Sequence, residues 1–143
     1  MLKDKEPPST VKNVMAKPVI TIDKSSSVRE AAKIMSEKGI GCIVVMDKGE
    51  PIGIATERDI LQRVVAKGLD ASKIEMKDIM SKPLITIKGK MPIIDAIRII
   101  EKNKIRRLLV MERGKLVGIV TQRDLLRALA FHVIISFRPL LHG

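Results

Sequence analysis

A repeat of 65 residues is the feature that most limits how this chain can fold. When the sequence is shifted by 65 positions it aligns with itself without a gap, and 19 of the 53 positions at 12–64 are identical to their partners. About a third of the other pairs exchange one apolar residue for another. An open solenoid generally needs three or more units. Two copies therefore predict a pseudo-two-fold pair in which each repeat closes the core of the other.

Each repeat has the sequence pattern of a β-α-β-β-α unit. In the first repeat, an extended run at 18–22 leads into a helix with Ser27 at the N-cap and Glu30 in the position of a capping box. Gly39 suits the C-terminal cap of this helix. The nearly continuous apolar run at 40–46 then predicts a strand that is buried on both faces.

A hairpin and a second helix complete the unit. Residues 47–50 predict a hairpin turn, which 112–115 repeat in the second copy, and residues 51–55 predict the returning strand. Thr56 is the expected N-cap of the second helix. The apolar stripe of that helix is expected to consist of Ile60, Leu61, Val64 and Val65.

These patterns predict the α/β (α+β) class, with two β-α-β-β-α repeats packed as a pseudo-two-fold pair. The expected boundaries are 10–66 for the first repeat, 67–75 for a linker, 76–130 for the second repeat and 131–143 for a C-terminal tail. The linker is expected to hold a short turn around Gly68, Leu69 and Asp70.

The first helix of the second repeat is apolar over more than one face. A surface helix needs an apolar arc of about 100°. Six apolar residues exceed that arc here: Ile93, Ile94, Ala96, Ile97, Ile99 and Ile100. The excess face predicts a homodimer interface, although deep burial within the pair would also account for it.

The charge of the chain is large and unevenly distributed. The 143 residues include 27 Lys and Arg against 16 Asp and Glu, a formal charge of +11, of which residues 1–71 carry +2 and residues 72–143 carry +9. Such a chain could bind nucleic acid. The sequence has no Trp or Tyr and two Phe, which weakens that interpretation because single strands are usually held by aromatic stacking.

Catalytic and metal chemistry find little support in the sequence. It shows no Ser/His/Asp arrangement, metal-ligand spacing or P-loop, so we expect no catalytic residues and no metal. The single Cys42 excludes an intramolecular disulfide and zinc sites built on CxxC pairs. We find neither the apolar region of a signal peptide nor a run long enough to span a membrane, and we expect a cytoplasmic protein.

Two motifs give the tandem units a resemblance to the CBS domain. Gly-h-x-Thr-x-x-Asp, where h is apolar, occurs at 53–59 and 118–124, and Lys-x-x-Met-x-x-x-(Val/Leu)-Ile-Thr-Ile occurs at 12–22 and 77–87. The pair resembles a Bateman module over residues 10–130. The resemblance implies a non-catalytic regulatory module that binds adenosine ligands in clefts between the repeats. These ligands are usually AMP, ADP or ATP, and S-adenosylmethionine in some members.

The resemblance assigns the ribose to Asp59 and Asp124, and one carboxylate can accept hydrogen bonds from both hydroxyls of a vicinal diol. Thr56 and Thr121 match the hydroxyl residue that contacts ribose or phosphate. Both motifs begin a helix, where backbone N–H groups and the dipole favour an anion. Thr-x-x-Asp is also an ordinary helix cap, and the two roles can coexist.

The resemblance further implies that each cleft is built across the two repeats. The cleft with the second-repeat motif is expected to be lined by Met15, Pro18, Ile20, Ile40, Gly41, Cys42, Arg107, Ile119, Thr121, Arg123 and Asp124. The cleft with the first-repeat motif is expected to be lined by Ile54, Thr56, Arg58, Asp59, Met80, Pro83, Ile85, Ile105 and Arg106. Adenine would then lie between aliphatic side chains and backbone groups.

Arg106 and Arg107 stand where the first repeat has Gly41 and Cys42. Guanidinium groups suit bidentate phosphate contacts, although the two arginines could also form a solvated basic edge. Secondary phosphate candidates are Lys17, Lys82, Arg58 and Arg123. The two clefts are therefore expected to differ in affinity, with the tighter one at Asp124 and Arg107 on its phosphate.

We therefore expect a stand-alone CBS-pair regulatory protein that binds an adenine nucleotide, forms a homodimer and signals to a separate protein partner. The mechanism would be a ligand-driven shift of conformational populations. A nucleic-acid-binding protein and an S-adenosylmethionine-binding pair remain the alternatives. The tail is expected to continue the last helix until Pro139.

Overall fold

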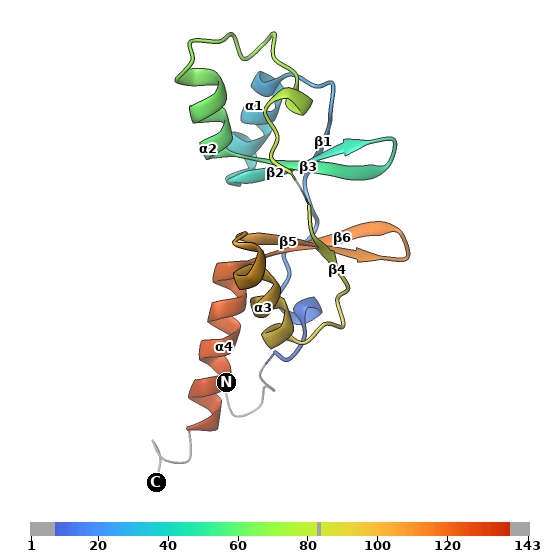
Figure 1. The fold of residues 1–143 in the computed structure, drawn as a ribbon, viewed down its shortest axis with the longest axis vertical. Helices are drawn as coiled ribbons and strands as arrows, with labels where there is room; N and C mark the ends of the chain where they lie inside the picture. Colours follow the sequence, from blue (N-terminus) through green and yellow to red (C-terminus); the bar gives the residue numbers. More distant parts are fainter. Residues whose placement is uncertain (1–7, 83, 138–143) are drawn as a thin grey trace. The chain divides into compact units, whose positions relative to one another are not determined.

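The computed structural model describes residues 8–82 and 84–137. They form two compact units, which we call the contiguous unit (residues 19–84) and the composite unit (residues 8–18 with 85–137). Each unit contains a three-stranded sheet with its two longer helical segments on one face (Figure 1). The unit boundaries differ from the repeat boundaries, because the first residues of each repeat pack on the other repeat.

The contiguous unit contains the strands and helices of the first repeat. Its sheet has the order β1-β2-β3, with β1 parallel to β2 and β2 antiparallel to β3. The elements are β1 (Thr21–Asp23), α1 (Val28–Lys38), β2 (Cys42–Asp47), β3 (Glu50–Thr56), α2 (Glu57–Ile60), the π-helical turn η3 (Leu61–Val65) and the 3-10 turn η4 (Met76–Asp78).

The composite unit repeats this topology with β4 parallel to β5 and β5 antiparallel to β6. The elements are the 3-10 turn η2 (Val11–Asn13), β4 (Thr86–Ile87), α3 (Ile93–Asn103), β5 (Arg107–Glu112), β6 (Lys115–Thr121) and α4 (Gln122–Ser136). The predicted β-α-β-β-α order is therefore confirmed in both repeats.

Local sequence signals account for the ends of α1 and for the hairpin turns. The Ser27 hydroxyl accepts a hydrogen bond from the Glu30 amide at 3.1 Å, and Gly39 closes the helix at φ 64°. The return bond from the Glu30 side chain, which a capping box would add, does not form among the described residues. Lys48 and Gly49 both have positive φ in the β2–β3 hairpin, as a two-residue turn requires.

A short turn in the linker holds the chain between the repeats close to α1. The Asp70 carboxylate accepts hydrogen bonds from the hydroxyl and the amide of Ser72, at 2.7 and 2.9 Å. These two bonds lower the pKa of Asp70. The Ala71 carbonyl accepts from the Arg29 amide at 3.0 Å, which ties this turn to the start of α1.

Equivalent backbone pairs attach the first residues of each repeat to the other repeat. In the contiguous unit, Ile54 and Ser81 exchange two hydrogen bonds of 3.1 and 2.8 Å. In the composite unit, Ala16 and Ile119 exchange two of 2.8 and 3.2 Å. A residue near the start of one repeat thus pairs with the last strand of the other repeat, next to the Thr-x-x-Asp motif.

Each unit has its own apolar core, built from the inner strands and the facing helix residues. The strand β2 is buried on both faces at Ile43, Val44 and Val45, as predicted, and β5 is buried at the equivalent positions. The contiguous core includes Val28, Ala31, Met35, Val64, Met76 and Ile79. The composite core includes Val11, Ile93, Ala96, Ile100, Leu125 and Ala128.

One predicted apolar face differs from the structure, and a second is mostly buried. Val64 is buried and Ile60 is half-buried, but Leu61 and Val65 are 59% and 60% exposed, so half of the predicted stripe was wrong. The cause is the π-helical turn η3, which changes the angular spacing of side chains that the 3.6-residue period assumes. Among the apolar side chains of α3, which is described throughout, Ile94 alone is exposed, so this helix is mostly buried within its own unit.

The helix α4 runs past residue 130 to Ser136, while Pro139 lies outside the described residues. The His132 imidazole Nε2 donates to the carbonyl oxygen of Pro8. The outer face of α4 and the residue after it expose Leu126, Leu129, Val133, Ile134 and Phe137. No helix in residues 8–82 and 84–137 has the length and hydropathy needed to cross a membrane.

Candidate functional site

The first Thr-x-x-Asp motif forms a complete reciprocal box at the start of α2. The Asp59 amide donates to Thr56 Oγ1 at 3.2 Å, and Asp59 Oδ2 accepts from the Thr56 amide at 2.9 Å and from the Thr56 hydroxyl at 3.1 Å. Asp59 is buried. The capping role that the sequence allowed for this motif is therefore confirmed.

The second oxygen of the Asp59 carboxylate is also engaged. Ser81 Oγ donates to Asp59 Oδ1 at 3.1 Å, and Arg63 Nε lies 3.9 Å from the same oxygen. Arg63 Nη1 donates to the carbonyl oxygens of Ile79 and Met80 at 2.8 and 3.1 Å. Asp59 thus joins the start of α2 to the first residues of the second repeat.

The second motif forms the same box at the start of α4 but has no further partner. The Asp124 amide donates to Thr121 Oγ1 at 3.1 Å, and Asp124 Oδ2 accepts from the Thr121 amide at 3.1 Å. Within the described part of the chain, no donor or cation pairs with Asp124 Oδ1. The residues equivalent to Ser81 and Arg63 are Ala16 and Ala128, which cannot hydrogen-bond through their side chains.

The helices that follow the two motifs also differ. The helix α4 has 15 residues, whereas α2 has four residues of α-helix before it continues as the π-helical turn. Aligned peptide dipoles add along a regular helix, so the amides at the start of α4 favour an anion more strongly. Two features, the free Asp124 oxygen and the longer helix, distinguish the composite unit.

The entry of the second strand lies beside the motif of the same repeat. Cys42 is the cross-strand partner of Thr56, and Arg107 is the cross-strand partner of Thr121. The Arg107 Nε is buried and has no hydrogen-bond partner among the described residues. Arg106 is exposed, and its carbonyl oxygen accepts from the Gln122 amide at 2.8 Å. Arg107 therefore combines a position next to the motif with an unsatisfied donor.

Each predicted cleft draws its residues from both units. For the second-repeat motif, the composite unit supplies Met15, Pro18, Arg107, Ile119, Thr121, Arg123 and Asp124, and the contiguous unit supplies Ile20, Ile40, Gly41 and Cys42. For the first-repeat motif, the contiguous unit supplies Ile54, Thr56, Arg58, Asp59 and Met80, and the composite unit supplies Ile85, Ile105 and Arg106. Pro83 lies outside the described residues. The assembly of these halves into clefts stays a prediction.

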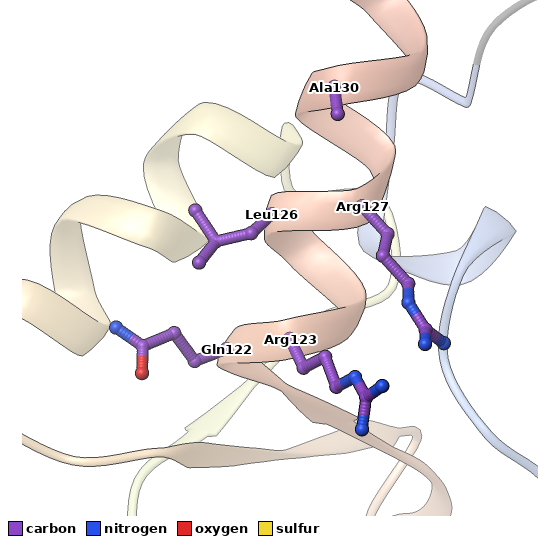
Figure 2. Close-up of a pocket in the computed structure, with 5 residues that line it drawn as sticks. All are labelled: Gln122, Arg123, Leu126, Arg127 and Ala130. Carbon is purple, nitrogen blue, oxygen red and sulfur yellow. The ribbon is translucent and has the colours of Figure 1, made fainter.

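An open groove of about 420 Å³ runs along the first half of α4 (Figure 2). Arg123 and Arg127 project to one side of it, and Gln122 and Leu126 project to the other. Of these residues, the sequence predicted only Arg123 as a site residue. The spacing of four residues between two exposed arginines was the signal that could have identified Arg127 as well.

Ser81 and Arg63 are site residues that the sequence did not predict.

Within the described ranges, no group of three or more His, Cys, Asp or Glu side chains could hold a metal ion. The site therefore consists of a hydroxyl, a carboxylate, helix amides and nearby guanidinium groups. This set can accept hydrogen bonds from a diol and can donate to an anion.

Two β-α-β-β-α repeats, each with a Thr-x-x-Asp box at its last strand-to-helix junction, are the signature of a class of regulatory module. The family model for the CBS domain matches residues 11–66 and 76–131. The chain belongs to the CBS domain family. The modules of this family are typically regulatory and non-catalytic.

Relatives and solved structures agree with this assignment. An uncharacterized protein from Methanopyrus kandleri, MK0525, is 41% identical over 120 residues, which span 82% of this chain and 61% of that protein. A candidate signal-transduction protein with CBS domains from Burkholderia ambifaria MC40-6 is 29% identical, with a TM-score of 0.74 over 84% of this chain and 93% of its own. A hexameric CBS-CP12 protein from bloom-forming cyanobacteria is 30% identical, with a TM-score of 0.75 over 85% of this chain and 73% of its own.

Proposed function

We propose that this chain is a non-catalytic regulatory module of the cytoplasm that binds AMP, ADP or ATP and signals its occupancy to a separate protein. Nucleotide binding shifts the population of module conformations, and the partner reads the conformation that the nucleotide favours. Membership of the CBS family supports the regulatory role, since adenine nucleotides are common ligands of these domains.

The observation that carries the proposal is the state of Asp124. Its Oδ2 completes the helix cap, while its Oδ1 has no donor among the described residues. A ribose 2′,3′-diol presents two hydroxyl donors close together and can use the free oxygen without breaking the cap. The motif can therefore hold α4 in place and bind ribose at the same time.

Arg107 is the proposed phosphate contact of this site. A buried N–H without a partner costs about 1–3 kcal/mol, so a change of side-chain conformation that brings the Arg107 Nε to a phosphate oxygen would recover this cost. The composite unit carries 13 Lys and Arg against four Asp and Glu in its described residues, whereas the contiguous unit carries 11 against ten. The positive field of the composite unit favours ligands with several phosphates.

A thermal-shift panel with AMP, ADP, ATP, NAD and S-adenosylmethionine tests the proposal. An adenine nucleotide at about 100 times its dissociation constant should stabilise the fold by about 2.7 kcal/mol and raise the melting temperature. Asp124→Asn keeps an oxygen that can accept from the Thr121 amide but removes the charge, so it should lose most of the shift while keeping its melting temperature without ligand.

Asp59→Asn is the matched control, because it makes the same change in the equivalent motif. A shift that survives Asp124→Asn would contradict the assignment of the ribose to Asp124. No shift with any of the three nucleotides would defeat the proposed function, and a shift with S-adenosylmethionine alone would change the ligand.

Nucleic-acid binding, the alternative supported by charge, gives a different result. Contacts with several phosphates of a nucleic acid release counterions, so affinity falls steeply with salt. Such binding would survive Asp124→Asn, because no ribose diol is required. Duplex and single-stranded DNA and RNA therefore belong in the panel, at two salt concentrations.

We also propose that the module assembles as a homodimer. The hexameric CBS-CP12 protein supports assembly in this family. The exposed apolar residues of α4 and Phe137 provide a surface that a second copy could cover.

A further inference from the structure

Two substitutions between the repeats change what surrounds the aspartate of the motif. Ser81, which lies beside the first-repeat motif, is equivalent to Ala16 beside the second-repeat motif. Arg63, in the helix after the first-repeat motif, is equivalent to Ala128 in the helix after the second-repeat motif. The backbone next to both aspartates is otherwise equivalent, because Ser81 pairs with Ile54 as Ala16 pairs with Ile119. The different partners of Asp59 and Asp124 therefore arise from side chains and not from a different fold.

We propose that Arg63 and Ser81 form a clamp with Asp59 that holds the segment at 76–82 on the first repeat and withholds the Asp59 carboxylate from ligand. Arg63 and Ser81 are then residues that set nucleotide affinity without touching the nucleotide. This inference rests on the proposed function for its ligand, but the clamp itself is measurable without one.

Arg63 reaches the clamp from the π-helical turn. The Ala66 amide donates to the Leu61 carbonyl at 2.8 Å, and the Leu69 amide donates to the Val64 carbonyl at 3.0 Å, both across five residues. In this turn Val64 is buried and Arg63 bonds the carbonyls of Ile79 and Met80. In the regular helix α4, the residue equivalent to Arg63 is the buried Ala128. The position four residues after the aspartate therefore holds a cation in the irregular helix and a small buried side chain in the regular one.

The hydrogen-bond capacity of the two carboxylates explains the difference in affinity. Asp59 Oδ2 accepts from the amide and the hydroxyl of Thr56, and Asp59 Oδ1 accepts from Ser81 and faces Arg63. A ribose at Asp59 would have to displace Ser81, whereas a ribose at Asp124 displaces nothing among the described residues. Hydrogen bonds to charged groups are the stronger kind, so this exchange weakens binding at Asp59.

The test exchanges the residues that differ between the motifs. Isothermal titration of the full chain with AMP and ATP should show one strong site, which Asp124→Asn removes and Asp59→Asn leaves. Ser81→Ala and the double variant Arg63→Ala/Ser81→Ala should strengthen the second site by about tenfold, the change expected for one charge-assisted hydrogen bond. Asp59→Asn in the double-variant background should remove this gain.

The reciprocal change is Ala16→Ser, at an exposed position whose backbone matches that of Ser81. Its hydroxyl can donate to Asp124 Oδ1 and should weaken the strong site by about tenfold. Gln62→Ala is the control for Arg63→Ala, since it truncates the exposed neighbouring residue of the same turn. Weaker binding at Asp59 in Ser81→Ala would overturn the proposal, because Ser81 would then be a ligand contact.

Hydrogen exchange without ligand separates this inference from the proposed function. In Arg63→Ala, but not in Gln62→Ala, the amides of Ile54 and Ser81 should exchange about tenfold faster, since the clamp holds their pairing. Faster exchange in a chain that binds no adenine nucleotide would support the clamp and defeat the proposed function. Unchanged exchange would overturn the clamp whatever the chain binds.

Discussion

Asp59 and Asp124 occupy the same position in the two repeats, and both complete the same helix cap. The sequence predicted both the cap and the equivalence, because Thr-x-x-Asp is a local signal. It did not predict that Ser81 donates to Asp59, since that contact joins residues 22 positions apart and depends on where the first residues of the second repeat pack. The sequence therefore predicted the helix cap, but it did not predict which side chain pairs with the second carboxylate oxygen of Asp59.

The glycine before each motif permits a close approach of a methionine from the start of the other repeat. A Cβ on Gly118 would lie 2.8 Å from the Met15 Cγ, and a Cβ on Gly53 would lie 2.7 Å from the Met80 Cγ. Gly118→Ala and Gly53→Ala should each displace this methionine and cost about 1–3 kcal/mol of unfolding free energy. Urea titration followed by circular dichroism measures the loss.

Gly41→Ala is the control for these variants. A Cβ on Gly41 would lie 3.8 Å from Glu57 Oε1, an ordinary contact, and should change the unfolding free energy by less than about 0.5 kcal/mol. Equal losses in all three variants would mean that methionine packing is not the cause.

At the scale of the elements, the order of strands and helices followed the sequence closely. The hairpin at Lys48 and Gly49, the caps at Ser27 and Gly39 and the buried strand β2 all form where the pattern placed them. The stripe of the second helix was half wrong, because the 3.6-residue period does not hold in a π-helical turn. Nothing in the local sequence distinguishes this turn from ordinary helix.

The helix α1 gives a direct test of capping. Ser27→Ala removes the hydroxyl that accepts from the Glu30 amide and should cost about 1 kcal/mol of unfolding free energy. Ser36→Ala, in the exposed interior of the same helix, should be neutral or slightly stabilising. Urea midpoints of the two variants measure the difference, and a loss in Ser36→Ala as large as in Ser27→Ala would contradict a specific cap.

At the scale of the whole molecule, the compact units cross the boundaries of the repeats. Residues 8–18 belong with the second repeat, and residues 76–84 belong with the first. The alignment of the repeats showed which residues are equivalent, but not which repeat each connecting segment packs on. That choice depends on contacts such as Met15 with Gly118, which are distant in sequence.

Assembly is the prediction that belongs to this scale. The sequence placed the dimer interface on α3, but Ile94 is the exposed apolar side chain of that helix, at 46%. The outer surface of α4 exposes Leu126, Leu129, Val133 and Ile134 by 37–49%, followed by Phe137 at 54%. Burial of apolar surface contributes about 25 cal/mol per Å² to the free energy of association, so burying the α4 surface stabilises a dimer more than burying Ile94 does. We therefore expect the two copies to meet along α4.

Val133→Glu should therefore convert a dimer into a monomer, because it places a charge in the centre of the α4 surface. Analytical ultracentrifugation of the variant and the original chain, over a hundredfold range of concentration, measures the change. Val65→Glu is the matched control, since Val65 is 60% exposed on the contiguous unit and the substitution is the same. A dimer that survives Val133→Glu but dissociates in Val65→Glu or Ile94→Glu would move the interface away from α4, and a chain that sediments as a monomer before any substitution would remove the dimer altogether.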